Sequence, residues 1–304
     1  MIQRIGPVSI GWPSPADDPA APHPPADWWV RSLTAAEASC RRGQSGAPWF
    51  DSGDWSGVET ASWVAWISNR GKDAAAWGEG TGPALREALS VVIPAILRRD
   101  GLLDGHGALV APDPSRPDDG VFITGLSGSG KSTLAVACAL AGARFVSDDS
   151  LAIGSSPHGL RGWSRRASMS LAGSIHRRLL PGGVHDEVNG KVWFDAAATF
   201  GDLAVDSLQV CSVLFLHRAS DGSRQASAGE PSAFPPADAY RSLLMGHPIL
   251  AIDSGARACF RVVRSLVDLP AFRMANGADV LENPKLACAA LARLLPRDSV
   301  RETP

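Results

Sequence analysis

The chain has 304 residues, 45% hydrophobic and 20% charged, so it can bury a large core, and intrinsic disorder is excluded as its dominant state. Its 29 Lys and Arg against 31 Asp and Glu give a net charge of −2, which provides no strong overall field for nucleic acid or an anionic membrane. The length fits one large or two modest domains.

The spacing of the cysteines and the length of the apolar runs bear on the cellular compartment in which the protein is expected. Five cysteines without paired spacing predict scattered core residues rather than zinc ligands or a disulfide framework; they are Cys40, Cys138, Cys211, Cys259 and Cys288. The N-terminal segment lacks the apolar run of a signal peptide, and no run approaches the ~20 residues that span a bilayer. We therefore expect a cytoplasmic protein with neither nucleic acid nor a membrane as partner.

The first hundred residues differ in composition from the rest. Residues 1–35 are rich in Pro and Ala and predict an irregular arm. Residues 58–69 have the mixed apolar pattern of a strand, and residues 83–101 predict a helix that ends in basic residues and a glycine. Eight of the ten tryptophans precede residue 78. We expect residues 1–100 to form a small Trp-rich α+β module of undetermined fold.

From residue 106 the pattern alternates between apolar strands and helices. The predicted strands are 106–112, 120–125, 144–153, 188–195 and 207–218, and the predicted helices are 132–143, 239–246, 258–269 and 283–296. Residues 154–186 show only weak periodicity. The pattern predicts a second domain at 101–304, of the α/β class, with a mixed sheet flanked by helices.

A phosphate-binding motif lies between the strand at 120–125 and the helix at 132–143. The sequence GLSGSGKST satisfies GxxxxGK[ST], in which glycines let backbone N–H groups converge on a phosphate at a helix N-terminus. Lys131 would reach the β- and γ-phosphates, and the Ser132 hydroxyl would bind Mg²⁺. The predicted nucleotide-binding residues are Gly125, Ser127, Gly128, Ser129, Gly130, Lys131, Ser132 and Thr133. The motif in this context predicts a nucleoside triphosphate site.

Two acids follow the helix of the motif. Asp148 and Asp149 end the run FVSDD, fifteen residues beyond Thr133. One carboxylate can hold Mg²⁺ while the other accepts a proton from an attacking hydroxyl, as a kinase requires. The alternative is a single metal-binding acid with a solvent-facing neighbour.

Roughly residues 100–215 resemble the catalytic domain of the HPr kinase/phosphorylase family of bacterial protein-serine kinases. His106-Gly107 matches a His-Gly of that family, and GLSGSGKST followed by GARFVSDDSLAI is similar to its GxSGxGKS…GHxLVADDxVxI. The segment from Glu187 to Gly201 has the length and end residues of the family signature, which starts Glu-Ile-Arg-Gly and finishes Phe-Gly. The resemblance implies a P-loop-containing mixed sheet flanked by helices, like that of HPr kinase and PEP carboxykinase.

The resemblance also implies roles. Asp148 would be the base that deprotonates the acceptor serine, and Lys131 would bind phosphate. Ser132, Asp149 and Glu187 would hold the metal, and His106 would modulate the proton affinity of the acids. Which aspartate takes which role stays open. ATP and Mg²⁺ would be the cofactors, the partner would be a peptide or small protein carrying a serine, and a homo-oligomer is compatible with the family.

The sequence departs from the family in four places, one of which is a longer distance from Asp149 to Glu187. Asn189 stands where the family has Arg, the later Gly-Arg-Asn loop has no clear match, and the N-terminal region is unlike the usual domain. These departures favour a divergent HPr-kinase-like enzyme, such as the kinases of lasso-peptide biosynthesis. A nucleotide-dependent switch without phosphotransfer and a small-molecule kinase are the alternatives.

Several further residues allow two interpretations. The basic runs at 161–166 and 176–178 either bind phosphate or an acidic peptide end, or are solvated loop charges. Lys191 either faces the phosphates or is an exposed strand lysine, which we favour. Arg257, Arg261 and Arg264 predict a solvated helix face. The N-terminal tryptophans predict a packed core, the alternative being that Trp28, Trp29 and Trp55 present aromatic surface to the acceptor peptide.

Overall fold

The computed structural model describes residues 2–11, 28–32, 49–51, 54–79, 83–165, 168–181, 187–217, 230–246, 256–277 and 279–296. The chain divides into two compact units. The first comprises Met1–Gly101 with Ala251–Ala258, and the second comprises Leu102–Leu250 with Cys259–Pro304.

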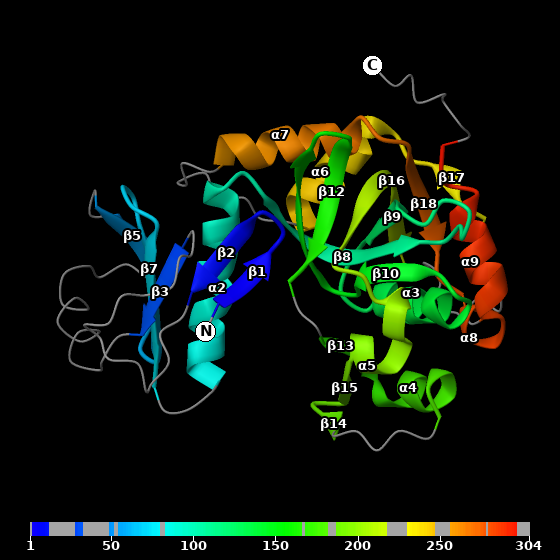
Figure 1. Ribbon diagram of the computed structural model, residues 1–304, viewed down its shortest axis with the longest axis horizontal. Helices are drawn as coiled ribbons and strands as arrows, with labels where there is room; N and C mark the ends of the chain where they lie inside the picture. Colours follow the sequence, from blue (N-terminus) through cyan, green and yellow to red (C-terminus); the bar gives the residue numbers. More distant parts are fainter. Residues whose placement is uncertain are drawn as a thin grey trace. The chain divides into compact units, whose positions relative to one another are not determined.

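The first unit is built on one mixed sheet, whose described strands run in the order β1-β2-β3-β7-β6-β5-β4 (Figure 1). Strand β3 pairs in parallel with β2 and β7, whereas the other neighbours pair antiparallel. The strands are β1 (Ile2–Ile5), β2 (Val8–Gly11), β3 (Trp28–Ser32), β4 (Trp49–Asp51), β5 (Trp55–Glu59), β6 (Trp63–Ser68) and β7 (Asp73–Gly78).

Helix α2 (Pro83–Arg99) packs on strands β6 and β7. Its first residue is proline, which fits the first helical position, and Arg98 and Arg99 lie in the last turn, where cations favour the helix dipole. Ala88, Val92 and Ile96 recur every fourth residue and are buried. The helix predicted for this region is confirmed.

The tryptophans of the first unit contribute to its core. Trp66 is only 2% exposed and clusters with Val64 and Ala75, while Trp55 and Trp77 pack against this cluster. The indole N–H of Trp66 donates to Glu59 over 3.1 Å. These contacts support the packing interpretation for the described tryptophans, whereas the side chains of Trp28 and Trp29 lie outside the described part.

The second unit contains a larger mixed sheet. Its described strands follow the order β10-β8-β11-β12-β16-β18-β17, with β9 paired to both β8 and β16. Strand β16 pairs in parallel with β9 and β18, so the carboxyl ends of these three strands lie at the same edge. The strands are β8 (Leu103–Ala111), β9 (Asp119–Thr124), β10 (Arg144–Ser147), β11 (Ser150–Ser156), β12 (Gly159–Ser164), β16 (Ser207–His217), β17 (Ser232–Ala233) and β18 (Ala271–Ala275).

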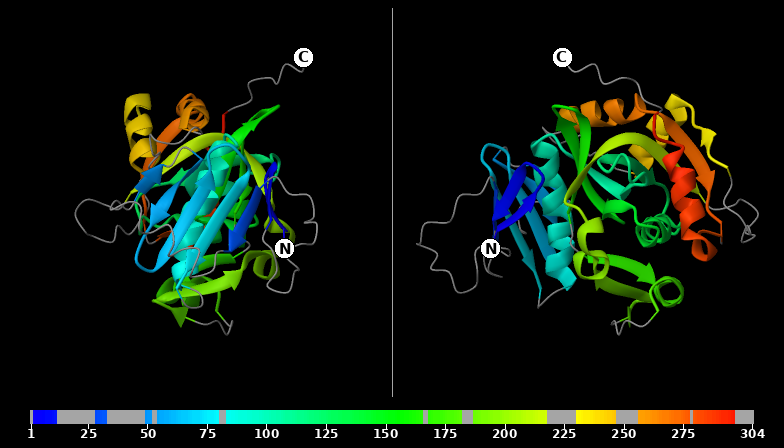
Figure 2. Two further views of the ribbon diagram at one scale, coloured as in Figure 1. Left: turned by 90° about the vertical axis from the view of Figure 1, so that its left-hand side faces the viewer. Right: turned by 45° about the vertical axis from the view of Figure 1, so that its right-hand side comes forward.

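Helices cover both faces of this sheet, which can be followed in Figures 1 and 2. Val121 and Ile123 of β9 join the cluster formed with α3 (Lys131–Leu140) and α9 (Pro284–Ala292). Phe122, on the opposite side of the same strand, joins the cluster formed with α6 (Pro236–Gly246) and α7 (Ala256–Val267). The alternation creates two apolar cores, and the expected mixed sheet flanked by helices is confirmed.

A small sheet forms a separate layer of the second unit (Figure 1). Its strand order is β13-β15-β14, all antiparallel. The elements of this part are β13 (Ser168–Ala172), α4 (Gly173–Leu179), β14 (Glu187–Val188), β15 (Lys191–Asp195), α5 (Ala196–Phe200) and the 3₁₀ turn η1 (Gly201–Leu203); the short α8 (Asp279–Glu282) precedes α9.

Several features differ from the sequence-based expectations. Residues 1–35, expected to form an irregular arm, contain strands β1, β2 and β3. The weakly periodic residues 154–186 include β12, β13 and α4, whose small and basic residues conceal their period. The strand expected at 144–153 is interrupted at Asp148 and Asp149, and β18 was not predicted because its five residues include Arg273. The strand expected to start at His106 instead starts at Leu103, which places His106 within it.

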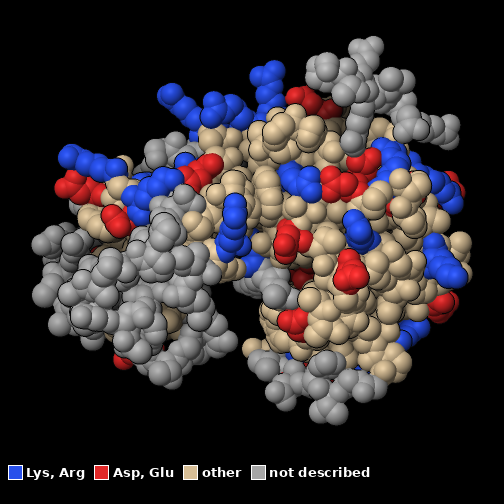
Figure 3. All heavy atoms as spheres, viewed as in Figure 1, with Lys and Arg blue, Asp and Glu red and all other residues tan. Residues whose placement is uncertain are grey.

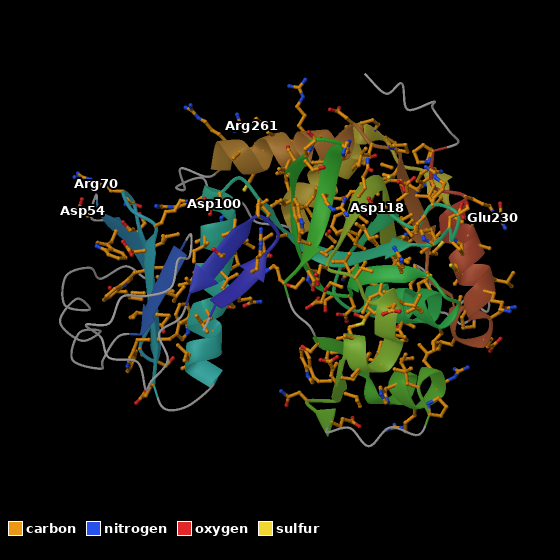
Figure 4. All side chains as sticks on the ribbon, viewed as in Figure 1. Asp54, Arg70, Asp100, Asp118, Glu230 and Arg261 are labelled. Carbon is orange, nitrogen blue, oxygen red and sulfur yellow. The ribbon has the colours of Figure 1, made fainter. Side chains whose placement is uncertain are left out.

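The exposed charges show no single-sign field over the view of Figure 3. Basic spheres lie along α7, where Arg257, Arg261 and Arg264 are all exposed, and Arg261 projects away from the helix (Figure 4). The predicted solvated helix face is therefore confirmed.

Cys138, Cys211, Cys259 and Cys288 are buried free thiols, as expected of core cysteines. No helix in the described parts of the chain is long and apolar enough to cross a membrane.

Candidate functional site

The loop Gly125–Gly130 connects the end of β9 to the start of α3. Gly125, Gly128 and Gly130 have φ values of 149°, 76° and 99°, in the region that favours glycine. A Cβ on Gly125 would lie 2.1 Å from the carbonyl oxygen of Leu216 on β16. The glycines of the motif are thus required by the backbone path, and the loop ends at a helix N-terminus whose N–H groups favour an anion.

Lys131 turns its side chain back over this loop. Its Nζ donates hydrogen bonds to the carbonyl oxygens of Gly125 (2.9 Å) and Leu126 (3.2 Å). The residue is 5% exposed, and burial lowers the pKa of its ammonium group, which the charges of Asp149 and Asp148 oppose. The structure therefore places a desolvated ammonium group against the first two residues of the loop.

Asn276, which follows β18, makes hydrogen bonds both to the end of β16 and to the loop. Its backbone N–H donates to the carbonyl oxygen of His217 (3.0 Å), and its Nδ2 donates to the carbonyl oxygen of Ser129 (3.1 Å). A Cβ on Gly130 would lie 1.8 Å from that Nδ2. Sequence reasoning missed Asn276, because it is 147 residues from Ser129 and belongs to no local motif.

Asp148 lies in the break between β10 and β11 and is 2% exposed. Its carboxylate accepts the backbone N–H of Ser170 on β13 (3.3 Å), and the hydroxyl of Ser132 lies near enough to favour the ionised carboxylate and so to lower its pKa. Burial nevertheless raises the pKa of Asp148 to about 6, and the neighbouring charge of Asp149 adds to the rise. Asp148 is thus a desolvated carboxyl group in contact with the hydroxyl of the phosphate-binding motif.

Asp149 has a different environment. Its Oδ1 lies 3.0 Å from Nδ1 of His106, and both side chains are nearly half exposed. The backbone carbonyl oxygen of Asp149 accepts the N–H of Gly107 (3.1 Å), which extends the pairing of β11 with β8. The structure therefore brings His106 to the acid pair, in contact with its accessible member.

Glu187 belongs to β14, and its Oε2 lies 3.5 Å from Nη1 of Arg177 on α4. In the described residues no three His, Cys, Asp or Glu side chains are gathered in a group that could hold a metal ion, so Glu187 does not form one with Asp148 and Asp149. The role expected for Glu187 in metal binding stays a prediction.

Asn189 and Gly190 form the turn that joins β14 to β15. Their φ values are 53° and 74°, as in the two-residue Asn-Gly hairpin turn. The Asn that departs from the family signature therefore has a backbone reason in this chain.

Four arginines of the basic runs at 161–166 and 176–178 form ion pairs with carboxylates of the same chain. Arg161 pairs with Asp118 through two hydrogen bonds of 2.8 and 3.1 Å, and Arg165 pairs with Asp104. On α4, Arg177 pairs with Glu187 and Arg178 approaches Glu282 at 4.0 Å. These contacts favour a structural role for the four arginines; Arg166 lies outside the described residues.

The donors at the site fit a magnesium ion. Mg²⁺ is usually held by one or two carboxylates together with substrate phosphates and waters. The hydroxyl of Ser132 and the carboxylate of Asp148 are in contact beside the loop, and Asp148 is a buried acid for which a cation would offset the cost of ionisation.

Comparison with known proteins gives only a distant structural similarity. No protein-family model and no curated protein matches the chain. Among solved structures, the Hpr(Ser) kinase/phosphatase from Coxiella burnetii is similar, with 17% identity over 62% of this chain and 88% of that chain, and a TM-score of 0.37. A likeness of this degree shows no family, so the chemistry of this chain rests on its own residues.

Proposed function

We propose that the protein is an ATP- and Mg²⁺-dependent kinase that transfers the γ-phosphate to a hydroxyl group, the acceptor being a serine of a peptide or small protein. The observation that carries this proposal is the contact between Ser132 of the glycine-rich loop and Asp148, with Asp149 and His106 beside it. The proposed phosphate-binding loop and the two acids therefore lie next to each other.

The loop supplies binding and charge neutralisation. Backbone N–H groups at the start of α3 and the ammonium group of Lys131 face the position where the phosphates would lie. Ser132 and Asp148 would hold the metal, which supplies neutralisation of the charge that develops on the phosphate oxygens. Phosphoryl transfer depends mainly on such positioning and electrostatic stabilisation.

The contacts also distinguish the two acids. Asp148 is buried against the metal-binding hydroxyl, whereas Asp149 is accessible and paired with His106. We therefore assign the metal to Asp148 and the proton of the acceptor hydroxyl to Asp149. This assignment exchanges the two roles first expected from the family resemblance. His106 would hold the Asp149 carboxylate in place and stabilise its charge.

The assignment predicts different defects for the two asparagine variants. Asp149→Asn should lower phosphotransfer at least 100-fold with little change in ATP affinity, because only the proton acceptor is lost. Asp148→Asn should weaken MgATP binding more than binding of ATP in EDTA. Transfer of labelled γ-phosphate to peptides encoded by neighbouring genes, together with calorimetric titration, measures both. Asp206→Asn, at an exposed position, is the control.

The same assay tests the proposed function itself. A labelled peptide supports the kinase, and a labelled metabolite would instead support a small-molecule kinase. Hydrolysis without transfer, changed by a binding partner, would support a nucleotide-dependent switch. Full transfer activity in both asparagine variants would contradict any role of the acid pair in catalysis.

A further inference from the structure

Strand β15 presents alternate side chains to opposite sides of the small sheet. Val192 and Phe194 are buried, whereas Lys191, Trp193 and Asp195 are exposed. Because side chains alternate along a strand, the three exposed residues share the face away from the apolar cluster. Lys191 therefore belongs to an accessible face of the small sheet.

The register of the small sheet connects this face to the acid pair. Ser170 of β13 is opposite Trp193, and Ala172 is opposite Lys191. The backbone N–H of Ser170 donates to Asp148, so β13 is attached to the candidate site along its outer edge. Lys191 is thus on the strand next to β13, two residue pairs along the sheet from Ser170, which donates to Asp148, and Lys191 is exposed.

Lys191 differs from the other cations of this part of the chain. Arg177 and Arg178 each have a carboxylate partner, as do Arg161 and Arg165. The described residues provide no ion-pair or hydrogen-bond partner for Lys191. An exposed ammonium group without a carboxylate partner favours the binding of an anion.

We propose that Lys191 binds the terminal phosphate of the nucleotide as a second ammonium group, supplied by the small sheet, in addition to Lys131. This inference rests on the proposed function and extends it. Lys131 is tied to the loop and serves any nucleotide with a β-phosphate, whereas Lys191 approaches from the side of the acids and serves the phosphate to be transferred. The chemical class recognised by Lys191 is thus a nucleoside triphosphate rather than a diphosphate.

The test is a comparison of nucleotide affinities by calorimetric titration of the full chain, with the β,γ-imido analogue of ATP and with ADP, both with Mg²⁺. Lys191→Met should weaken binding of the triphosphate analogue about 10-fold, as expected for loss of one charge-assisted hydrogen bond, and change ADP affinity less than about twofold. Lys191→Arg should restore most of the triphosphate affinity, because the charge is kept. Lys285→Met, at an exposed lysine of α9, is the matched control.

Equal losses for both nucleotides, or no loss for either, would overturn the inference. Lys131→Met separates this failure from that of the proposed function. If the wild type binds both nucleotides and Lys131→Met binds neither, an unchanged Lys191→Met overturns the role of Lys191 alone. If the wild type binds neither nucleotide, the proposed function fails and the inference with it. Unchanged thermal unfolding of Lys191→Met shows that any loss of affinity is local.

Discussion

At the residue scale, Asp148 is a residue whose burial lowers the stability of the protein when its carboxyl group is ionised. The backbone N–H of Ser170 and the hydroxyl of Ser132 both favour the ionised form of its carboxyl group, yet burial still raises its pKa to about 6. A carboxyl group with a pKa of 3.8 in the unfolded chain binds its proton more tightly once folded. Native stability is therefore greatest while Asp148 is protonated in both states, and it falls as the pH rises from about 4 to about 6.

The contribution of Asp148 to the pH dependence of stability should disappear when its carboxyl group is removed. The shift corresponds to a cost of about 3 kcal/mol at neutral pH, an upper value because the asparagine changes the hydrogen bonds as well. Asp148→Asn should thus unfold at higher temperature than the wild type at pH 8 and lose this advantage at pH 4. Thermal unfolding in EDTA without nucleotide measures this, and an advantage that is independent of pH would contradict it.

At the element scale, the end of α3 shows how a single glycine terminates a helix. Gly142 has a φ of 92°, its N–H donates to the carbonyl oxygen of Ala139, and the N–H of Ala143 donates to that of Cys138. This is the double hydrogen bond of a Schellman motif, which satisfies the last carbonyls of a helix. The motif fixes where the helix of the phosphate loop ends and where β10 begins.

Replacement of Gly142 isolates the backbone effect, since a Cβ there would meet nothing within 4 Å. Gly142→Ala should lower the free energy of unfolding by about 1–2 kcal/mol, because an L-residue disfavours the left-handed region. Gly142→Asn should cost less, since asparagine tolerates that region. Urea unfolding of both variants checks the order, and equal costs would show that φ is not the cause.

The elements that local patterns specify are the ones that the sequence predicts. Helix α3 and strands β9 and β16 follow from apolar runs with glycine signals. Strands β13 and β18 depend on partners that are not adjacent in the chain, β15 and β16, and have no strong period of their own. The candidate site divides in the same way: its loop and acids lie in motifs, whereas Asn276 and the contact from Ser170 depend on tertiary pairing.

At the scale of the whole molecule, the uneven distribution of tryptophans means that most of the intrinsic fluorescence comes from the first unit. Eight tryptophans precede residue 78, and the second unit contains only Trp163 and Trp193. Each unit has an apolar cluster of its own. Intrinsic fluorescence should therefore report chiefly on the unfolding of the first unit, and calorimetry on both.

Nucleotide should stabilise the two units unequally. MgATP at 100 times its dissociation constant adds about 2.7 kcal/mol to a unit that binds it, or roughly 5–10 °C in a domain of about 200 residues. We expect this shift in the calorimetric transition of the second unit and little change in the fluorescence transition. Lys131→Met should abolish the shift, whereas equal shifts in both signals would show that the units unfold together.

The hydrogen bonds of Lys131 have a consequence for how quickly a nucleotide is exchanged. Its ammonium group already has two carbonyl acceptors within its own loop. An incoming phosphate therefore replaces existing bonds and does not meet a bare charge, so the net gain in free energy is only the difference between the two sets. In the proposed kinase, the same two carbonyl groups would accept the lysine again when the product departs, which would limit the affinity for the product.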